Sequence, residues 1–76
     1  MPTFEYTVNN EPQTTTGHAL TPAQIMITAG IDPATNYLIG IVGATQKSYK
    51  DKPEEQIRMH ENMKFITNFT GEVPVS

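Results

Sequence analysis

The side chains best suited to catalysis are few and widely spaced in this chain. A catalytic base could come from the two histidines, His18 and His60, and a hydroxyl nucleophile from the two serines, Ser48 and Ser76. Their spacing matches no catalytic triad. Neither serine lies in a Gly-x-Ser-x-Gly turn. The absence of cysteine excludes thiol catalysis, disulfides and thiolate metal sites together. We therefore expect no catalytic residue and interpret these four side chains as surface or loop groups.

Metal and cofactor binding have no better support. The two histidines are not at the spacing of a zinc-binding pair. Glu54 and Glu55 are adjacent carboxylates in a polar segment after Pro53, a pattern typical of a solvated surface rather than of an acid and base pair. Gly40 and Gly43 flank an Ile-Val pair and lack the glycine spacing and the following helix of a dinucleotide site. We expect no metal, no cofactor and no enzymatic activity.

Composition excludes two further classes of partner. The 76 residues make a single domain, and a net charge of −3 with five scattered Lys and Arg does not favour binding to nucleic acid. No apolar run approaches the length of a membrane span, and the first residues lack the basic and apolar regions of a signal peptide. We expect a soluble, cytoplasmic protein with no nucleic-acid or membrane partner.

The elements that must position any binding surface are organised around one short helix. Thr21 and Gln24 form a Thr-x-x-Gln capping box, and a proline follows the cap. Gly30 supplies the left-handed residue that ends many helices, and Asp32-Pro33 prevents the helix from resuming. These signals predict a helix over about 22–29. Its apolar side, which must pack on other elements, consists of Pro22, Ile25, Met26 and Ala29.

Strand patterns lie on both sides of this helix. An alternating segment and a Thr-rich segment precede it, and an apolar run, a short bridge and a second alternating segment follow it. The strands are expected at 3–8, 13–16, 37–42, 57–59 and 63–69. We interpret 44–55 as a long loop with a short edge pairing around Lys47 to Tyr49.

This order of elements predicts an α+β fold, a β-grasp arrangement in which one helix packs on one face of a mixed sheet of four to five strands. The last strand is expected to run parallel to the first, because the helix is a crossover connection. Residues 1–70 would form the domain and residues 71–76 a flexible C-terminal tail. The expected core contains Phe4, Tyr6, Ile25, Ala29, Phe65 and Phe69.

One face of the predicted sheet has no second layer and is therefore a candidate interaction surface. The strand 37–42 is apolar on both parities, so either Tyr37, Ile39 and Ile41 or Leu38 and Val42 point away from the helix. Our candidate interaction face consists of Leu38, Val42 and Ile66, with Ile66 placed there because its parity opposes that of Phe65 and Phe69. Alternatively, the loop 44–55 folds over this face and covers it.

The chain resembles the bacterial multiubiquitin family of ubiquitin-like domains. The resemblance rests on Leu20-Thr-x-x-Gln-Ile-x-x-x-Ala-Gly-Ile-Asp-Pro33, on Asn36-Tyr-Leu-Ile39, and on Ile57-x-Met59-x-x-x-Met-Lys-Phe-Ile-Thr67. It implies a ubiquitin-like fold and a protein modifier attached to targets through its carboxyl end. The implied partners are activating-enzyme-like and conjugating-enzyme-like proteins, a deconjugating peptidase and target proteins. A non-covalent interaction module that docks through the exposed sheet face is the alternative.

The carboxyl end departs from the usual modifier pattern. Ubiquitin-like modifiers commonly end in Gly-Gly, whereas this chain has only Gly71 near its end and finishes at Ser76. Either a peptidase trims the tail, or the enzymes of this family accept another end, or the chain is not conjugated. Gly71 and Ser76 are thus the candidate residues for processing or conjugation.

Overall fold

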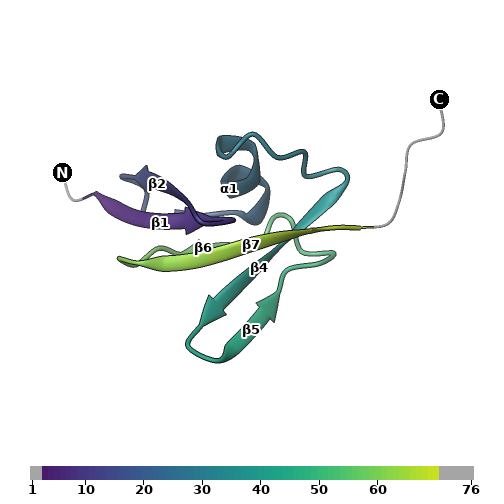
Figure 1. Cartoon of the computed structure of the whole chain (residues 1–76). Helices are drawn as coiled ribbons and strands as arrows, with labels where there is room; N and C mark the ends of the chain where they lie inside the picture. Colours follow the sequence, from purple (N-terminus) through teal and green to yellow (C-terminus); the bar gives the residue numbers. More distant parts are fainter. Residues whose placement is uncertain (1–2, 71–76) are drawn as a thin grey trace.

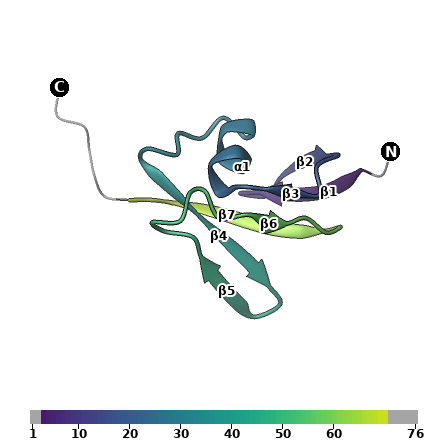
Figure 2. The same ribbon diagram turned by 180° about the vertical axis from the view of Figure 1, so that it is seen from behind.

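The computed structural model describes residues 3–70, whose main element is a mixed five-stranded sheet with one helix packed on one face (Figures 1 and 2). The strand order in this sheet is β2-β1-β7-β4-β5, and two short strands, β3 and β6, form a separate pair. The prediction of a small α+β domain with a mixed sheet and one helix is confirmed. The elements are β1 (Phe4–Val8), β2 (Glu11–Thr15), β3 (Ala19–Leu20), α1 (Pro22–Thr28), β4 (Asn36–Val42), β5 (Thr45–Ser48), β6 (Ile57–Arg58) and β7 (Met63–Phe69).

Two tight turns shape the antiparallel hairpins of the sheet. Val8 pairs with Glu11, so the β1–β2 loop is Asn9-Asn10, and both residues have positive φ (53° and 67°). Two positive φ angles define a type I′ turn, and asparagine tolerates this conformation better than most residues. The β4–β5 loop is Gly43-Ala44, with positive φ at Gly43 alone (59°), where glycine carries no steric penalty.

The central strand β7 joins the two halves of the chain. It pairs parallel with β1, with Tyr6 opposite Met63 and Val8 opposite Phe65, and antiparallel with β4 on its other side. The predicted parallel pairing of the first and last strands is therefore confirmed. It depends on α1, which carries the chain over one face of the sheet between β1–β2 and β4 (Figure 1).

The helix begins and ends where its sequence signals predict. The Thr21 hydroxyl accepts from the Gln24 backbone N–H (3.1 Å), and the Gln24 side chain accepts from the Thr21 N–H (2.9 Å), which completes the capping box. At the other end, Gly30 has φ of 79°, its N–H donates to the Ile27 carbonyl, and the Ile31 N–H donates to the Met26 carbonyl. This pair of hydrogen bonds is a Schellman motif. The last helical residue is Thr28, one before the predicted end, and Ala29 is the C-cap.

The core lies between α1 and the sheet. Tyr6, Ile25 and Phe65 are buried as predicted, and the rings of Tyr6 and Phe65 meet edge to face at 6.0 Å. Phe4 and Ala29 are partly buried against this core rather than inside it. Phe69 was predicted in the core but is 54% exposed, because it lies at the far end of β7 opposite Asn36. The other buried members are Val8, Met26, Leu38, Tyr49, Ile57 and Met59.

The segment predicted as a loop from 44 to 55 begins instead with a full strand. Residues Thr45–Ser48 form β5 and pair with β4 from Val42 to Ile39. The predicted edge pairing around Lys47 to Tyr49 is therefore confirmed, and the expectation of a loop is wrong at Thr45 and Gln46. The predicted bridge at 57–59 is confirmed as β6, which pairs antiparallel with β3. Among residues 3–70, no helix has the length and apolar character needed to cross a membrane.

Candidate functional site

The open face of the sheet, meaning the face turned away from α1, carries an apolar centre. Leu38 and Phe65 point into the core, so their neighbours Ile39 and Ile66 must point the other way. Ile39 lies directly opposite Ile66 across the β4–β7 ladder, and Ile41 is the next residue of β4 on the same face. We call Ile39, Ile41 and Ile66 the isoleucine patch.

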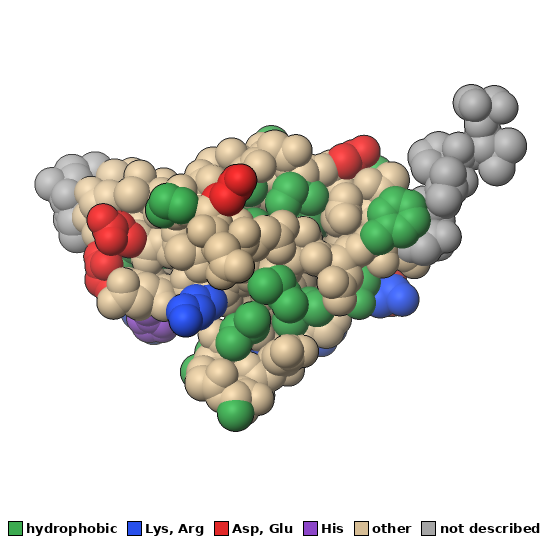
Figure 3. All heavy atoms as spheres, in the orientation of Figure 1, with side chains coloured by type: hydrophobic (Ala, Val, Ile, Leu, Met, Phe, Trp, Pro, Cys, Tyr) green, Lys and Arg blue, Asp and Glu red, His purple; other side chains and the backbone are tan. Residues whose placement is uncertain are grey.

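The three isoleucines differ in how far they are exposed. Ile39 is only 7% exposed although it does not belong to the cluster packed under α1, and Ile41 and Ile66 are half-buried. Cross-strand neighbours in a sheet have Cβ atoms close enough to cover each other in this way. In Figure 3 hydrophobic side chains gather over β4 and β7, with basic side chains on either side.

Polar residues surround the isoleucine patch. Lys64 lies opposite Ile41, and Thr7 of β1 lies opposite Lys64. On the β5 side, Gln46 is the partner of Ile41 and Ser48 is the partner of Ile39. An apolar centre with a polar rim is the usual anatomy of a protein-binding surface.

At one end of the patch an aromatic side chain is held by its neighbours. The Lys50 ammonium lies 5.6 Å from the centre of the Tyr37 ring, and the Tyr37 hydroxyl accepts from the Asn68 amide at 3.5 Å. Tyr37 shares the parity of Ile39 and Ile41, so it extends the patch along β4. Aromatic residues that keep one polar end are common in protein interfaces.

Two of the three residues predicted for this face lie elsewhere. Leu38 is fully buried under α1, so its placement on the exposed face is wrong. Val42 shares the parity of Leu38 and is 73% exposed because it lies near the tip of the β4–β5 hairpin. Ile66 points away from the helix as predicted. The alternative parity, with Tyr37, Ile39 and Ile41 on the open face, is the one that the chain adopts.

The loop that could have covered the open face lies on the other side of the sheet. The Pro53 carbonyl accepts from the Ala23 N–H at the start of α1 (3.1 Å). The Tyr49 N–H donates to the Leu38 carbonyl (2.8 Å), which continues the β4–β5 ladder, and the Tyr49 side chain is buried in the core on the helix side of the sheet. The loop from 50 to 56 therefore packs beside α1 and leaves the isoleucine patch uncovered by it.

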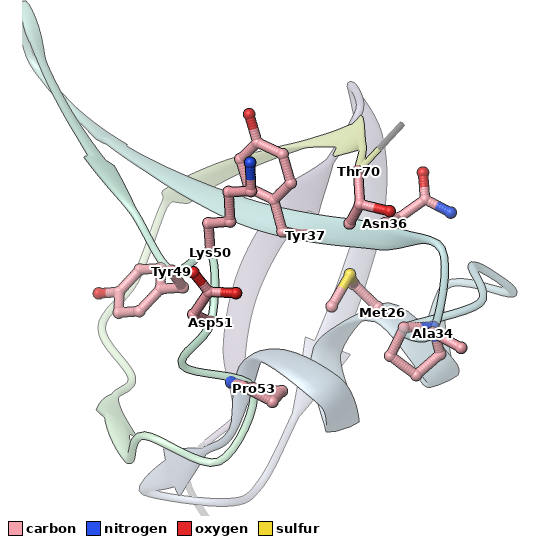
Figure 4. Close-up of a pocket in the computed structure, with 10 residues that line it drawn as sticks. Met26, Ala34, Asn36, Tyr37, Tyr49, Lys50, Asp51, Pro53 and Thr70 are labelled. Carbon is pink, nitrogen blue, oxygen red and sulfur yellow. The ribbon is translucent and has the colours of Figure 1, made fainter. Parts of the chain in front are cut away.

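This loop encloses a hollow of about 230 Å³ with the residues that follow the helix. Figure 4 shows Tyr37 and Lys50 on one side of it and Met26 on the other, with Asp51 and Thr70 also lining it. Its lining holds no histidine, serine or cysteine, so no nucleophile and base pair of the triad type meets here.

Within residues 3–70, each of His18, Ser48 and His60 contacts different neighbours, and Ser76 lies outside the described residues. The His18 ring packs edge to face against Phe4 at 5.8 Å, and the Ser48 hydroxyl accepts from the Lys50 N–H. The His60 backbone N–H contacts the Met63 sulfur at 3.1 Å. Within residues 3–70, no group of three His, Asp or Glu side chains is placed to hold a metal ion.

Gly71 and Ser76, the predicted processing or conjugation residues, lie outside the described residues. The described chain ends at Thr70, whose N–H donates to the Thr35 carbonyl (2.8 Å). This bond holds the end of β7 against the start of β4. Comparison of the chain with protein-family models, with curated proteins and with solved structures finds no match.

Proposed function

We propose that the chain is a ubiquitin-like β-grasp domain that acts as a protein modifier in a bacterial conjugation system. The observation that carries the proposal is the parallel pairing of β1 with β7 around a helix that crosses one face of a mixed sheet. The resemblance of the helix and last-strand residues to multiubiquitin domains supplies the functional part. By that resemblance, the carboxyl end would be joined to targets by enzymes similar to those for ubiquitin.

The isoleucine patch supports the proposal through what a modifier must do. An activating enzyme has to hold the folded body while the carboxyl end reacts, which requires an apolar docking surface outside the core. Half-buried Ile41 and Ile66, next to the nearly buried Ile39, supply such a surface on the open face, with a polar rim around it. This hydrophobic area lies outside the cluster that packs under α1.

The alternative is a non-covalent interaction module that binds partners through the same open face. The isoleucine patch supports this function equally, since it requires no reactive end. The two proposals differ in what residues 71–76 are for: a modifier needs its terminal carboxylate, whereas a docking module does not.

The experiment is incubation of the full chain with an activating-enzyme-like protein of the kind that the resemblance implies, together with ATP and Mg²⁺. A modifier gives an adduct in which mass spectrometry locates the bond at the carboxyl terminus or at a trimmed end. Full biological activity of a chain lacking 71–76 would exclude the modifier function and leave the docking module.

A further inference from the structure

The two outer edges of the five-stranded sheet differ in whether their outward backbone groups can hydrogen-bond to another strand. At the β2 edge, the two-residue turn makes Val8 and Glu11 a hydrogen-bonded pair, so the next residue, Pro12, faces away from β1. Proline has no N–H to donate, and it is a common device for blocking an exposed edge. The β2 edge is therefore protected.

The β5 edge has no such protection. The Tyr49 N–H donates to the Leu38 carbonyl, and alternate residues of an antiparallel strand point the same way, so Lys47 also faces β4. The backbone N–H and C=O groups of Gln46 and Ser48 consequently face outward. β5 contains no proline, its register with β4 is continuous, and all four of its residues are exposed. No strand in the described part of the chain pairs with this edge.

The surroundings of β5 leave room for an added strand. Figures 1 and 2 both show the β4–β5 hairpin projecting from the body on the side away from α1. A strand placed beside β5 would therefore not meet the helix.

We propose that the outer edge of β5 binds an extended segment of another protein, which adds to the sheet as a sixth strand and places a carboxylate opposite Lys47. Backbone hydrogen bonds to Gln46 and Ser48 would supply affinity, as in other strand additions. Lys47 is the one charged side chain of β5, and its ammonium lies 5.2 Å from the Tyr49 ring. An acidic side chain directly across from it forms a favourable cross-strand pair.

The same lysine disfavours a second copy of this chain as the occupant. If two β5 edges paired antiparallel with Gln46 opposite Ser48, the two Lys47 side chains would lie directly opposite each other. Like charges in that position are destabilising. In this register the edge is therefore better suited to an acidic extended segment than to a second copy of itself.

The probe is the blocked peptide acetyl-Thr-Val-Thr-Glu-Thr-Val-Thr-amide, added to the full chain while amide hydrogen exchange is followed by NMR. Exchange should slow at Gln46 and Ser48, whose N–H groups face outward, and should change little at Lys47, whose N–H already faces β4. Protection that appears without peptide as protein concentration rises would identify a second copy as the occupant and overturn the proposal. Absence of protection at both outward amides would overturn it as well.

Matched variants separate backbone pairing from side-chain effects. Gln46→Pro removes one outward donor, whereas Gln46→Thr keeps it, so the proline variant should bind the peptide about fivefold more weakly than the threonine variant. Lys47→Glu should weaken binding about threefold, and replacing the glutamate of the peptide by lysine should restore it. Circular dichroism melting checks that each variant folds.

Equal binding by the two Gln46 variants, or no charge dependence at Lys47, contradicts the proposal. Gln46 and Ser48 border the isoleucine patch, but Ile66 lies on β7, two strands away from the outer edge of β5, so Ile66→Asp should leave peptide binding unchanged. The proposal therefore stands or fails independently of the modifier function.

Discussion

At the scale of single residues, Tyr6 shows how burial becomes a pH dependence. Tyr6 is 2% exposed against Phe65, and burial raises the pKa of its hydroxyl above the ordinary value of 10.0. The folded state therefore holds this proton more tightly than the unfolded state. The contribution of Tyr6 to the free energy of unfolding is fully present below pH 10.0 and is lost as the pH rises above it, because the unfolded state then ionises first. Tyr6→Phe should lose less stability than the wild type across that range. Urea unfolding at neutral and alkaline pH measures the free energy of unfolding of both proteins. An equal decrease in the two proteins at alkaline pH would contradict the prediction.

Ile66 tests the isoleucine patch with one side chain. Ile66→Asp removes a cross-strand contact with Ile39, so we expect a loss of about 1 kcal/mol in the free energy of unfolding. The introduced carboxylate should abolish binding to the activating enzyme, because an unpaired charge would have to be desolvated in the interface.

Val42→Asp is the matched control. Val42 is exposed and lies on β4, next to the strand of Ile66, but its side chain is on the opposite face of the sheet from Ile66. It should fold and bind the enzyme normally. Circular dichroism melting beside a binding titration distinguishes the outcomes. Normal binding by folded Ile66→Asp would place the docking site elsewhere.

At the scale of elements, the end of α1 depends on a backbone conformation. Gly30 has φ of 79°, and a Cβ there would meet nothing within 4 Å, so a substitution costs backbone strain and not a steric clash with neighbours. Gly30→Val should lower the free energy of unfolding by about 1–2 kcal/mol, and Gly30→Asn by less, because asparagine tolerates positive φ. Thermal unfolding compares the two. An unchanged midpoint for Gly30→Val would mean that the Schellman turn contributes nothing.

The parallel contact between β1 and β7 is extended by one asparagine. The Asn9 N–H donates to the Phe65 carbonyl, while the Asn9 amide side chain donates to the Thr67 hydroxyl (2.9 Å) and accepts from the Thr67 N–H (3.0 Å). Asn9→Gly keeps the positive φ but loses both side-chain hydrogen bonds, so it should cost about 1–2 kcal/mol. Asn10→Gly keeps the same turn without that loss and should be nearly neutral. Urea unfolding of both variants checks this, and equal effects would refute the bridging role of Asn9.

The elements differ in how well the sequence predicts them, and the reason is locality. The capping box and the Gly30 exit act within a few residues, so α1 is predicted almost to the residue. The first half of β5 was interpreted as loop because Thr-Gln-Lys-Ser has no apolar face, and only pairing with β4 makes it a strand. Leu38 was assigned to the wrong face because β4 is apolar on both sides, so its parity is decided by packing under α1 and not by pattern.

At the scale of the whole molecule, the proposed modifier divides its work between body and end. The open face lies on the folded body, whereas under this proposal the carboxylate that would react belongs to residues 71–76. Enzyme affinity should then reside mainly in the isoleucine patch, because interface energy concentrates in a few apolar anchors.

This division predicts that a chain lacking 71–76 inhibits adduct formation by the full chain. The truncated body keeps its docking surface and forms no adduct itself, so it should compete for the activating enzyme. The same truncated chain carrying Ile66→Asp should not compete, because the docking contact is lost. Adduct formation is measured by mass spectrometry at increasing competitor concentration. If neither truncated chain competes, affinity depends on the carboxyl end, and if both compete equally, the enzyme binds a surface other than the isoleucine patch.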